Sequence, residues 1–301
     1  MKNEQTLTLE NNGLTFHAFD EGSGPVALCL HGFPDCARSF RHQLDVLAQA
    51  GYRAIAPTLR GYEPSSQPDD GDYNMVRMAE DVVAWIDELG VDRVHLIGHD
   101  WGAVIGYAAA ALAPERFHSL TTVAIPHVGR LQSDGLRKLP SQLRNSWYMA
   151  FFQIPGLSDY VVERRDWAFI EKLWRDWSPG WVLPDEELAL VKQTLALPGV
   201  KRAALGYYRA AARPGSEAGR RTSELLSAKI AVPTLAITGA LDGCMDTRMH
   251  EVAMLEEDFP KGFEMVRIEG AGHFVHQEKP DEFNSHMLRW LKRYSQGAGE
   301  S

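Results

Sequence analysis

Short apolar runs alternate with longer stretches of helical periodicity along most of the chain. The runs are rich in Val, Ile and Leu without clean polar alternation, which is typical of strands buried on both faces of a parallel sheet. The predicted strands are residues 14–19, 26–30, 53–56, 94–97, 120–124, 234–238 and 263–268. The predicted helices are residues 41–50, 75–89, 103–113, 247–258 and 281–294. This rhythm predicts an α/β fold with a mostly parallel central sheet flanked by helices.

The rhythm stops near Pro126 and resumes near Val232, and no strand is predicted between them. The segment holds five of the eight tryptophans, namely Trp147, Trp167, Trp174, Trp177 and Trp181. Residues 130–229 carry 16 Lys and Arg against 11 Asp and Glu, a net charge of +5, whereas the rest of the chain carries −14. Composition and periodicity therefore both mark this segment as distinct from its surroundings.

A helical insertion between two strands of an α/β sheet is typical of a lid over the carboxyl edge of the sheet, where such folds bind ligands. We therefore predict a core domain of residues 1–128 and 230–301, and a helical cap domain of residues 129–229. The alternative is a peripheral helical decoration without a role at the site.

The whole chain of 301 residues has a net charge of −9, with 45% hydrophobic and 24% charged residues, as in ordinary globular proteins. Net acidity argues against a nucleic-acid partner, because such binding depends mostly on neutralising phosphates. Three scattered cysteines argue against a disulfide scaffold. The chain shows no secretory leader and no run approaching the roughly 18–20 apolar residues that cross a bilayer. We therefore expect a soluble, cytoplasmic protein without a membrane partner.

The sequence Gly98-His99-Asp100-Trp101-Gly102 stands between a predicted strand and an alanine-rich predicted helix. Glycines allow the close backbone approach of a tight strand-to-helix turn, which pushes the central side chain to the edge of the sheet at an electropositive helix N-terminus. This placement predicts Asp100 as a nucleophile. On this motif alone, an Asp that merely caps the helix is an equal alternative.

Two further polar residues stand at the ends of later predicted strands. Asp242 follows one strand closely, and His273 follows the last strand. With Asp100 they give the order nucleophile, acid, histidine, which is the order expected for the α/β-hydrolase fold. Asp246 is the alternative acid, because it lies in the same loop as Asp242.

Three motifs together resemble the epoxide hydrolases of the α/β-hydrolase superfamily. They are His31-Gly32-Phe33-Pro34, Gly98-His99-Asp100-Trp101-Gly102 and Gly272-His273. The resemblance extends from about residue 12 to about residue 293 and implies an α/β-hydrolase fold with an inserted helical cap. One departure is the acid loop around Asp242, which in this chain reads Gly239-Ala240-Leu241-Asp242-Gly243-Cys244.

The resemblance also implies roles in the cap and around the nucleophile. Tyr148, which precedes Phe152-Gln153-Ile154-Pro155-Gly156, and Tyr208, within Tyr207-Tyr208-Arg209, resemble the ring-opening tyrosines of the family. The backbone N–H groups of Phe33 and Trp101 are expected to form the oxyanion hole, and the family resemblance assigns the same pair. The peptide bond between Phe33 and Pro34 is expected to be cis, as in relatives. The predicted substrate pocket comprises Phe33, Trp101, Trp147, Phe151 and Phe152.

An aspartate nucleophile suits displacement at a saturated carbon, which leaves an alkyl ester on the enzyme. Epoxide opening also needs a proton donor, and a tyrosine with a pKa of about 10 is one that stays protonated at neutral pH. We therefore predict a cofactor-free hydrolase acting on ether bonds, an epoxide hydrolase that converts a small apolar epoxide and water to a vicinal diol through an ester on Asp100. His273 would activate the water and Asp242 would orient His273.

Two alternatives remain open on the sequence. A haloalkane or haloacid dehalogenase would use the same Asp100, with Trp101 binding the halide and the two tyrosines serving only in packing. A noncatalytic ligand-binding or adhesion protein is the third hypothesis, because fold does not fix function. The chain shows neither a His-Glu-x-x-His pattern nor a glycine-rich phosphate loop, so we expect no metal and no cofactor. A monomer and a homodimer are equally compatible with the sequence.

Overall fold

The computed structural model describes residues 6–295, so the ends of the predicted core domain, residues 1–5 and 296–301, lie outside the described residues. The strands are β1 (Thr6–Asn11), β2 (Leu14–Gly22), β3 (Val26–Leu30), β4 (Arg53–Pro57), β5 (Val94–His99), β6 (Phe117–Val123), β7 (Thr234–Gly239) and β8 (Phe263–Ile268). The helices before β7 are α1 (Arg41–Gln49), α2 (Met75–Glu88), α3 (Trp101–Leu112), α4 (Val128–Arg130), α5 (Leu136–Lys138), α6 (Ser141–Asn145), α7 (Trp147–Phe151), α8 (Leu157–Trp177), α9 (Asp185–Ala196), α10 (Val200–Ala211) and α11 (Glu217–Ser227). After β7 come α12 (Met249–Ala253), α13 (Val275–Glu278) and α14 (Pro280–Ser295).

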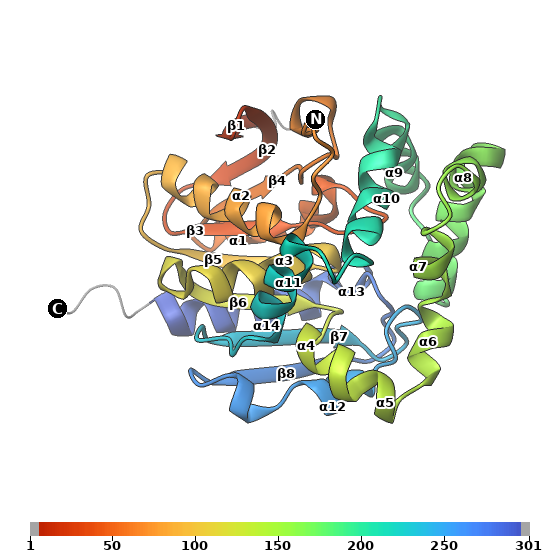
Figure 1. The fold of residues 1–301 in the computed structure, drawn as a ribbon. Coiled ribbons are helices and arrows are strands. Elements are labelled where there is room, and N and C mark those ends of the chain that lie inside the picture. Colours follow the sequence, from red (N-terminus) through yellow and green to blue (C-terminus); the bar gives the residue numbers. More distant parts are fainter. Residues whose placement is uncertain (1–5, 296–301) are drawn as a thin grey trace.

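The strands form one sheet in the order β1-β2-β4-β3-β5-β6-β7-β8 (Figure 1). β1 pairs antiparallel with β2, and β2 with β4, whereas the other neighbours pair in parallel. The predicted mostly parallel α/β sheet is therefore confirmed. The sequence analysis missed the strand β1. The helix that it predicted over residues 247–258 is too long, because α12 ends at Ala253. Leu255 is extended and is followed by a short 3₁₀ turn at Glu256–Asp258.

Side chains of the central strands enter two different cores, one on each face of the sheet. In β3, Val26, Leu28 and Leu30 pack into the core that contains α2 and α3. Ala27 and Cys29 pack into the other core, together with residues of α1 and α14. Because both faces are covered, both sets of positions are apolar, which explains the uninterrupted apolar runs in the sequence.

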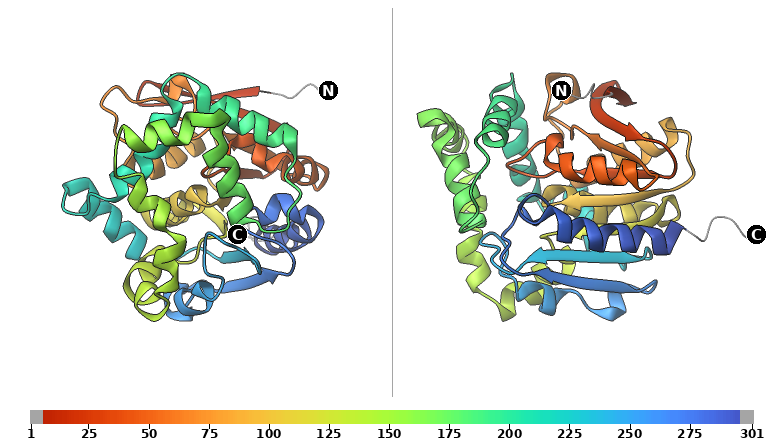
Figure 2. Two further views of the ribbon diagram at one scale, coloured as in Figure 1. Left: turned by 90° about the vertical axis from the view of Figure 1, so that its right-hand side faces the viewer. Right: turned by 180° about the vertical axis from the view of Figure 1, so that it is seen from behind.

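Helices α4 to α11 lie between β6 and β7 in the chain, and none of the strands described in residues 6–295 falls among them. Helices α6 to α10 stand along one side of the sheet (Figure 1 and Figure 2). They contact loops that follow the parallel strands, because the Trp174 indole donates to the Pro34 carbonyl at 2.8 Å and the His273 N–H donates to the Trp177 carbonyl at 3.0 Å. The helical segment therefore covers the edge at which the candidate residues were predicted.

Two further features concern the helices. The long α8 is interrupted at residues 164–167, where Arg165, Asp166 and Trp167 have positive φ angles. None of the helices described between residues 6 and 295 combines the length and the apolar character that crossing a bilayer requires.

Candidate active site

Asp100 occupies the turn between β5 and α3. Its φ of 51° and ψ of −117° lie in a region that residues with side chains rarely adopt. The turn is tight, because a methyl group on Gly98 would lie 2.2 Å from the Gly102 carbonyl oxygen, and one on Gly102 would lie 2.0 Å from that of Leu30. The Asp100 side chain makes no capping hydrogen bond to α3. The geometry is thus that of a nucleophile turn and not that of a helix cap.

His273 lies between two carboxylates. Its Nδ1 is 2.9 Å from Asp242 Oδ2, and its Nε2 is 3.5 Å from Asp100 Oδ2. Asp242 Oδ1 accepts the backbone N–H groups of Cys244 and Met245 at 2.8 and 2.9 Å. The fold therefore brings together the three residues that the sequence places after three separate strands, and all three are buried.

Asp246, the alternative acid, has a different set of partners. Its Oδ2 accepts the Ser141 hydroxyl at 2.8 Å and pairs with Arg248 at 2.6 Å. The hydrogen bond from Arg248 lowers the pKa of Asp246 to about 2. Since the carboxylate of Asp246 is engaged with these partners and that of Asp242 with His273, the geometry favours Asp242.

The charge of His273 is set by its two carboxylate neighbours. Burial alone would lower its pKa, but the carboxylates of Asp242 and Asp100 outweigh burial and raise the pKa of His273 to about 10. At neutral pH the ring is therefore an imidazolium.

The predicted oxyanion hole is partly engaged by Asp100 itself. The Phe33 N–H donates to Asp100 Oδ1 at 2.8 Å, and the Phe33–Pro34 peptide bond is cis, as expected. Within residues 6–295 no hydrogen bond joins the Trp101 N–H to the Asp100 carboxylate, although Trp101 is the first residue of α3. One carboxylate oxygen is thus held by Phe33, and the other points toward His273.

Tyr148 on α7 and Tyr208 on α10 lie side by side, with ring centroids 5.8 Å apart. Both line the same cavity as Asp100 and both are buried. Burial raises the pKa of each phenol well above its ordinary value, and the nearby Asp100 carboxylate adds to the effect. The two predicted ring-opening tyrosines are therefore protonated phenols next to the nucleophile.

The cavity has a volume of about 1540 Å³, which exceeds the usual range of about 300–1,000 Å³ for ligand pockets. Of the predicted pocket residues, Trp101 and Trp147 line it. Phe33, Phe151 and Phe152 form a layer of aromatic contacts behind the tyrosines, with Phe33 and Phe152 packed edge-on against Tyr208. The aromatic residues around Tyr148 therefore divide into a cavity wall and a supporting layer.

Comparison with known proteins identifies the family of this chain. Residues 25–280 match the family described as alpha/beta hydrolase fold. The chain is 31% identical to epoxide hydrolase 3 of Siraitia grosvenorii, over 96% of this chain and 98% of that protein. This chain belongs to the epoxide hydrolases of the α/β-hydrolase fold. Epoxide hydrolase A of Mycobacterium tuberculosis is 29% identical over 94% of this chain and 96% of its own length. The crystal structure of an epoxide hydrolase from Vigna radiata, 29% identical, superposes with a TM-score of 0.81 and covers 97% of this chain and 99% of that one.

The sequence analysis of this epoxide hydrolase did not identify the residues whose hydrogen bonds fix the loop that contains His273. The Ser178 hydroxyl accepts the His273 N–H at 3.0 Å and donates to Glu278 Oε1 at 2.6 Å. Glu278 also accepts the Gly272 N–H at 2.8 Å. Ser178 follows α8 and is 95 residues from His273, so no local pattern joins the two.

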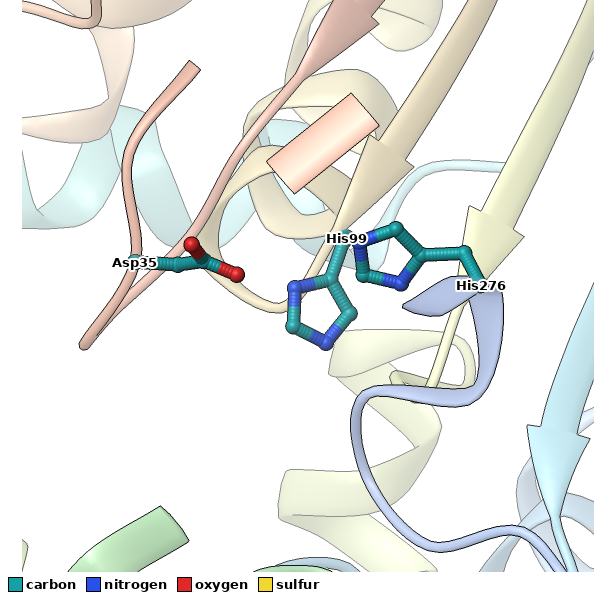
Figure 3. Close-up of side chains that lie close together, drawn as sticks. All are labelled: Asp35, His99 and His276. Atoms are coloured by element: carbon teal, nitrogen blue, oxygen red, sulfur yellow. The ribbon is translucent and has the colours of Figure 1, made fainter. Parts of the chain in front are cut away.

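Asp35, His99 and His276 form a buried cluster of polar side chains (Figure 3). The centroid of the His99 ring lies 4.9 Å from that of His273. Potential metal-ligand atoms of the cluster residues lie within 4.8 Å of one another, and the same holds for Asp242, Cys244 and His273. In the cluster, the Ser39 hydroxyl donates to Asp35 at 2.6 Å and lies 2.6 Å from His276 Nε2. His99 Nε2 lies 3.1 Å from the His273 carbonyl, and burial lowers the pKa of both cluster histidines well below the ordinary value. Both histidines are therefore uncharged at neutral pH, and His99 supports the backbone of His273.

Proposed function

We propose that this chain hydrolyses an apolar epoxide to a vicinal diol through a covalent ester on Asp100. One observation carries the proposal: two buried phenols, Tyr148 and Tyr208, line the same cavity as an aspartate whose carboxylate faces His273. An aspartate nucleophile calls for a leaving group on saturated carbon, and paired phenols suit a leaving oxygen that stays in the product. The match to named epoxide hydrolases over nearly the whole chain supports the same substrate class.

In the first half-reaction, an Asp100 oxygen attacks a ring carbon. The ester C–O bond forms as the ring C–O bond breaks, and the released electron pair goes to the ring oxygen. Phe33 holds Oδ1, so Oδ2 is the oxygen that attacks. Tyr148 and Tyr208 bind the ring oxygen, and one of them gives it a proton. A phenol, with an ordinary pKa of about 10, is a stronger acid than the alcohol that forms.

Ester formation changes the charge around His273. A neutral ester on Asp100 removes one of the two carboxylates that hold the pKa of His273 at about 10. The pKa of His273 therefore falls once the substrate is attached, and the proton that the ring loses replaces the one that the tyrosine gave to the ring oxygen. In this way the first step prepares the base that the second step needs.

In the second half-reaction, His273 takes a proton from the water that attacks Cγ of Asp100. Asp242, 2.9 Å from His273 Nδ1, stabilises the imidazolium that forms. The intermediate collapses, the bond between Cγ and the diol oxygen breaks, and that oxygen takes the proton from His273. The second proton of the water is left on the Asp100 carboxyl group and passes to His273, so that water and epoxide yield the diol and the resting protein with its imidazolium.

The same proposal assigns residues 129–229 as a cap domain over a core of residues 1–128 and 230–301. The supporting observation is the origin of the groups in the cavity. Tyr148 and Tyr208 come from α7 and α10, whereas Asp100 comes from the turn after β5. Nucleophile and proton donors therefore meet only where the helical segment packs on the sheet.

The test replaces both tyrosines by Phe and measures diol formation from epoxides and halide release from haloalkanes. Tyr148→Phe with Tyr208→Phe removes both hydroxyls and keeps both rings, so epoxide turnover should fall by at least about 10². Tyr160→Phe is the matched control, because Tyr160 lies in the same helical segment with its side chain exposed. Full epoxide turnover in the double variant would contradict the proposal, and unaffected halide release by wild type and double variant would indicate a dehalogenase.

A further inference from the structure

The two cavity tyrosines differ in what their hydroxyls contact. The Tyr148 hydroxyl lies 3.4 Å from Cys244 Sγ, and both groups are buried. The Tyr208 hydroxyl has no hydrogen-bond partner within residues 6–295, and its ring is enclosed by Trp101, Phe33 and Phe152. Tyr148 thus has a hydrogen-bond partner besides any substrate, whereas the Tyr208 hydroxyl only lies near the Trp101 indole, whose N–H acts to lower the pKa of this phenol against the effect of burial.

Cys244 also contacts the triad. Its backbone N–H donates to Asp242 Oδ1 at 2.8 Å, and its side chain lines the cavity. The hydrogen bond to Asp242 fixes the backbone of Cys244, so the thiol stands at a defined place beside Tyr148. The residue lies in the acid loop, in which the sequence departs from the family pattern.

We propose that Cys244 is a positioning residue that makes Tyr148 the proton donor in ring opening and leaves Tyr208 to bind the epoxide oxygen. The proposal rests on the proposed function. The thiol S–H donates to the Tyr148 oxygen, so that the Tyr148 O–H points to the epoxide oxygen. As the Tyr148 O–H bond breaks and the new O–H bond forms on the ring oxygen, the S–H keeps its bond to the phenolate. The thiol loses no proton in this step.

The physical reason is the cost of making a phenolate inside the protein. Hydrogen bonds to charged groups are stronger than those between neutral groups, so a donor beside the Tyr148 oxygen helps most when the proton has left. The Trp101 indole N–H acts on Tyr208 in the same sense, but without a hydrogen bond of ordinary geometry. Burial raises the pKa of the Cys244 thiol well above its ordinary value, which keeps the thiol protonated and unreactive toward the epoxide.

A first experiment reads the hydrogen bond without any reaction. The S–H stretching band of Cys244 is obtained from infrared spectra of the wild type minus those of Cys244→Ala. If the thiol donates to Tyr148, Tyr148→Phe shifts this band to higher frequency, whereas Tyr208→Phe leaves it in place. A band that Tyr148→Phe does not move would overturn the proposal.

A second experiment measures the role in catalysis by single-turnover ester formation with an epoxide. Cys244→Ala should slow this step roughly 3- to 30-fold, the value of one hydrogen bond to a developing charge. The loss should recur in the Tyr208→Phe background and vanish in the Tyr148→Phe background, because only Tyr148 depends on the thiol. Cys244→Ser should restore most of the rate, since its hydroxyl also donates. Cys36→Ser, outside the cavity wall, is the control.

Two kinds of failure are distinguishable. A wild-type protein that forms no ester from any epoxide overturns the proposed function, and the role of Cys244 with it. A wild-type protein that turns epoxide over, with an equal loss from Cys244→Ala in both tyrosine backgrounds, overturns only the role of Cys244. Comparison of melting temperatures separates either result from misfolding, and Cys244→Ser serves where Cys244→Ala does not fold.

Discussion

Replacing His273 by Gln should stop the reaction half-way and leave the substrate on Asp100. In the structure, His273 Nε2 lies 3.5 Å from Asp100 Oδ2, whereas the Phe33 N–H that holds Oδ1 and the two cavity tyrosines do not depend on the imidazole. The variant therefore keeps the groups that open the ring and loses the base that activates water. A positioned general base contributes about 10²–10⁴ in rate, or about 3–5 kcal/mol of barrier. Ester hydrolysis should slow by that factor, and the ester should accumulate.

The assay is intact mass after incubation with a panel of aryl and alkyl epoxides and haloalkanes, followed by peptide mapping. We expect a gain equal to the whole epoxide, one per chain, on the peptide that contains Asp100. His118→Gln is the matched control, because His118 lies on β6 and its ring packs near that of His95, away from the triad. The control should turn over epoxide and accumulate no adduct.

Two results would refute this reasoning. Undiminished steady-state diol formation by His273→Gln would show that another group activates the water. An adduct on a residue other than Asp100 would show that the strained turn after β5 does not carry the nucleophile. A gain equal to the haloalkane without its halide, and none from epoxides, would assign the same aspartate to dehalogenation.

Two further predictions concern stability. The pKa of His273, about 10 in the folded protein, exceeds the value of about 6.5 for an unfolded histidine, so its contribution is complete below pH about 6.5 and is lost as the pH rises through 10. The difference in unfolding free energy between wild type and His273→Gln should therefore shrink from pH about 6.5 to 10, and a constant difference in urea titrations would contradict the assignment. Gly102→Ala should destabilise the protein by about 1–3 kcal/mol or more, because the new methyl group would lie 2.0 Å from the Leu30 carbonyl oxygen. Gly215→Ala, with nothing within 4 Å of the added methyl group, should change stability by no more than about 0.5 kcal/mol in the same denaturant titration, and equal effects would refute the argument.

Most of the sheet is readable from the sequence because burial on both faces leaves a local signature. Val26–Leu30 and Phe263–Ile268 were predicted with the bounds that the structure shows. β1 was missed because it is an edge strand that pairs only with β2 and buries Leu9 alone, so most of its side chains stay polar. An edge strand of this kind forms because it pairs with its neighbouring strand, and its own residue pattern does not predict it.

The candidate triad was also predictable, for a topological reason. Carboxyl ends of parallel strands meet at one edge of a sheet, so polar residues after separate strands converge without any knowledge of side-chain packing. The strained turn at Asp100 followed from its two glycines, which are required because the backbone of Leu30 passes so close to Gly102.

Tertiary structure alone decided the contacts between distant segments. It showed that Asp242 rather than Asp246 faces His273, that Ser178 holds the His273 loop, and that Cys244 touches Tyr148. Ser178 and His273 are 95 residues apart, and Tyr148 and Cys244 are 96 apart. No sequence periodicity predicts contacts between such distant residues, because the distance between their side chains depends on how the helical segment packs against the strand ends.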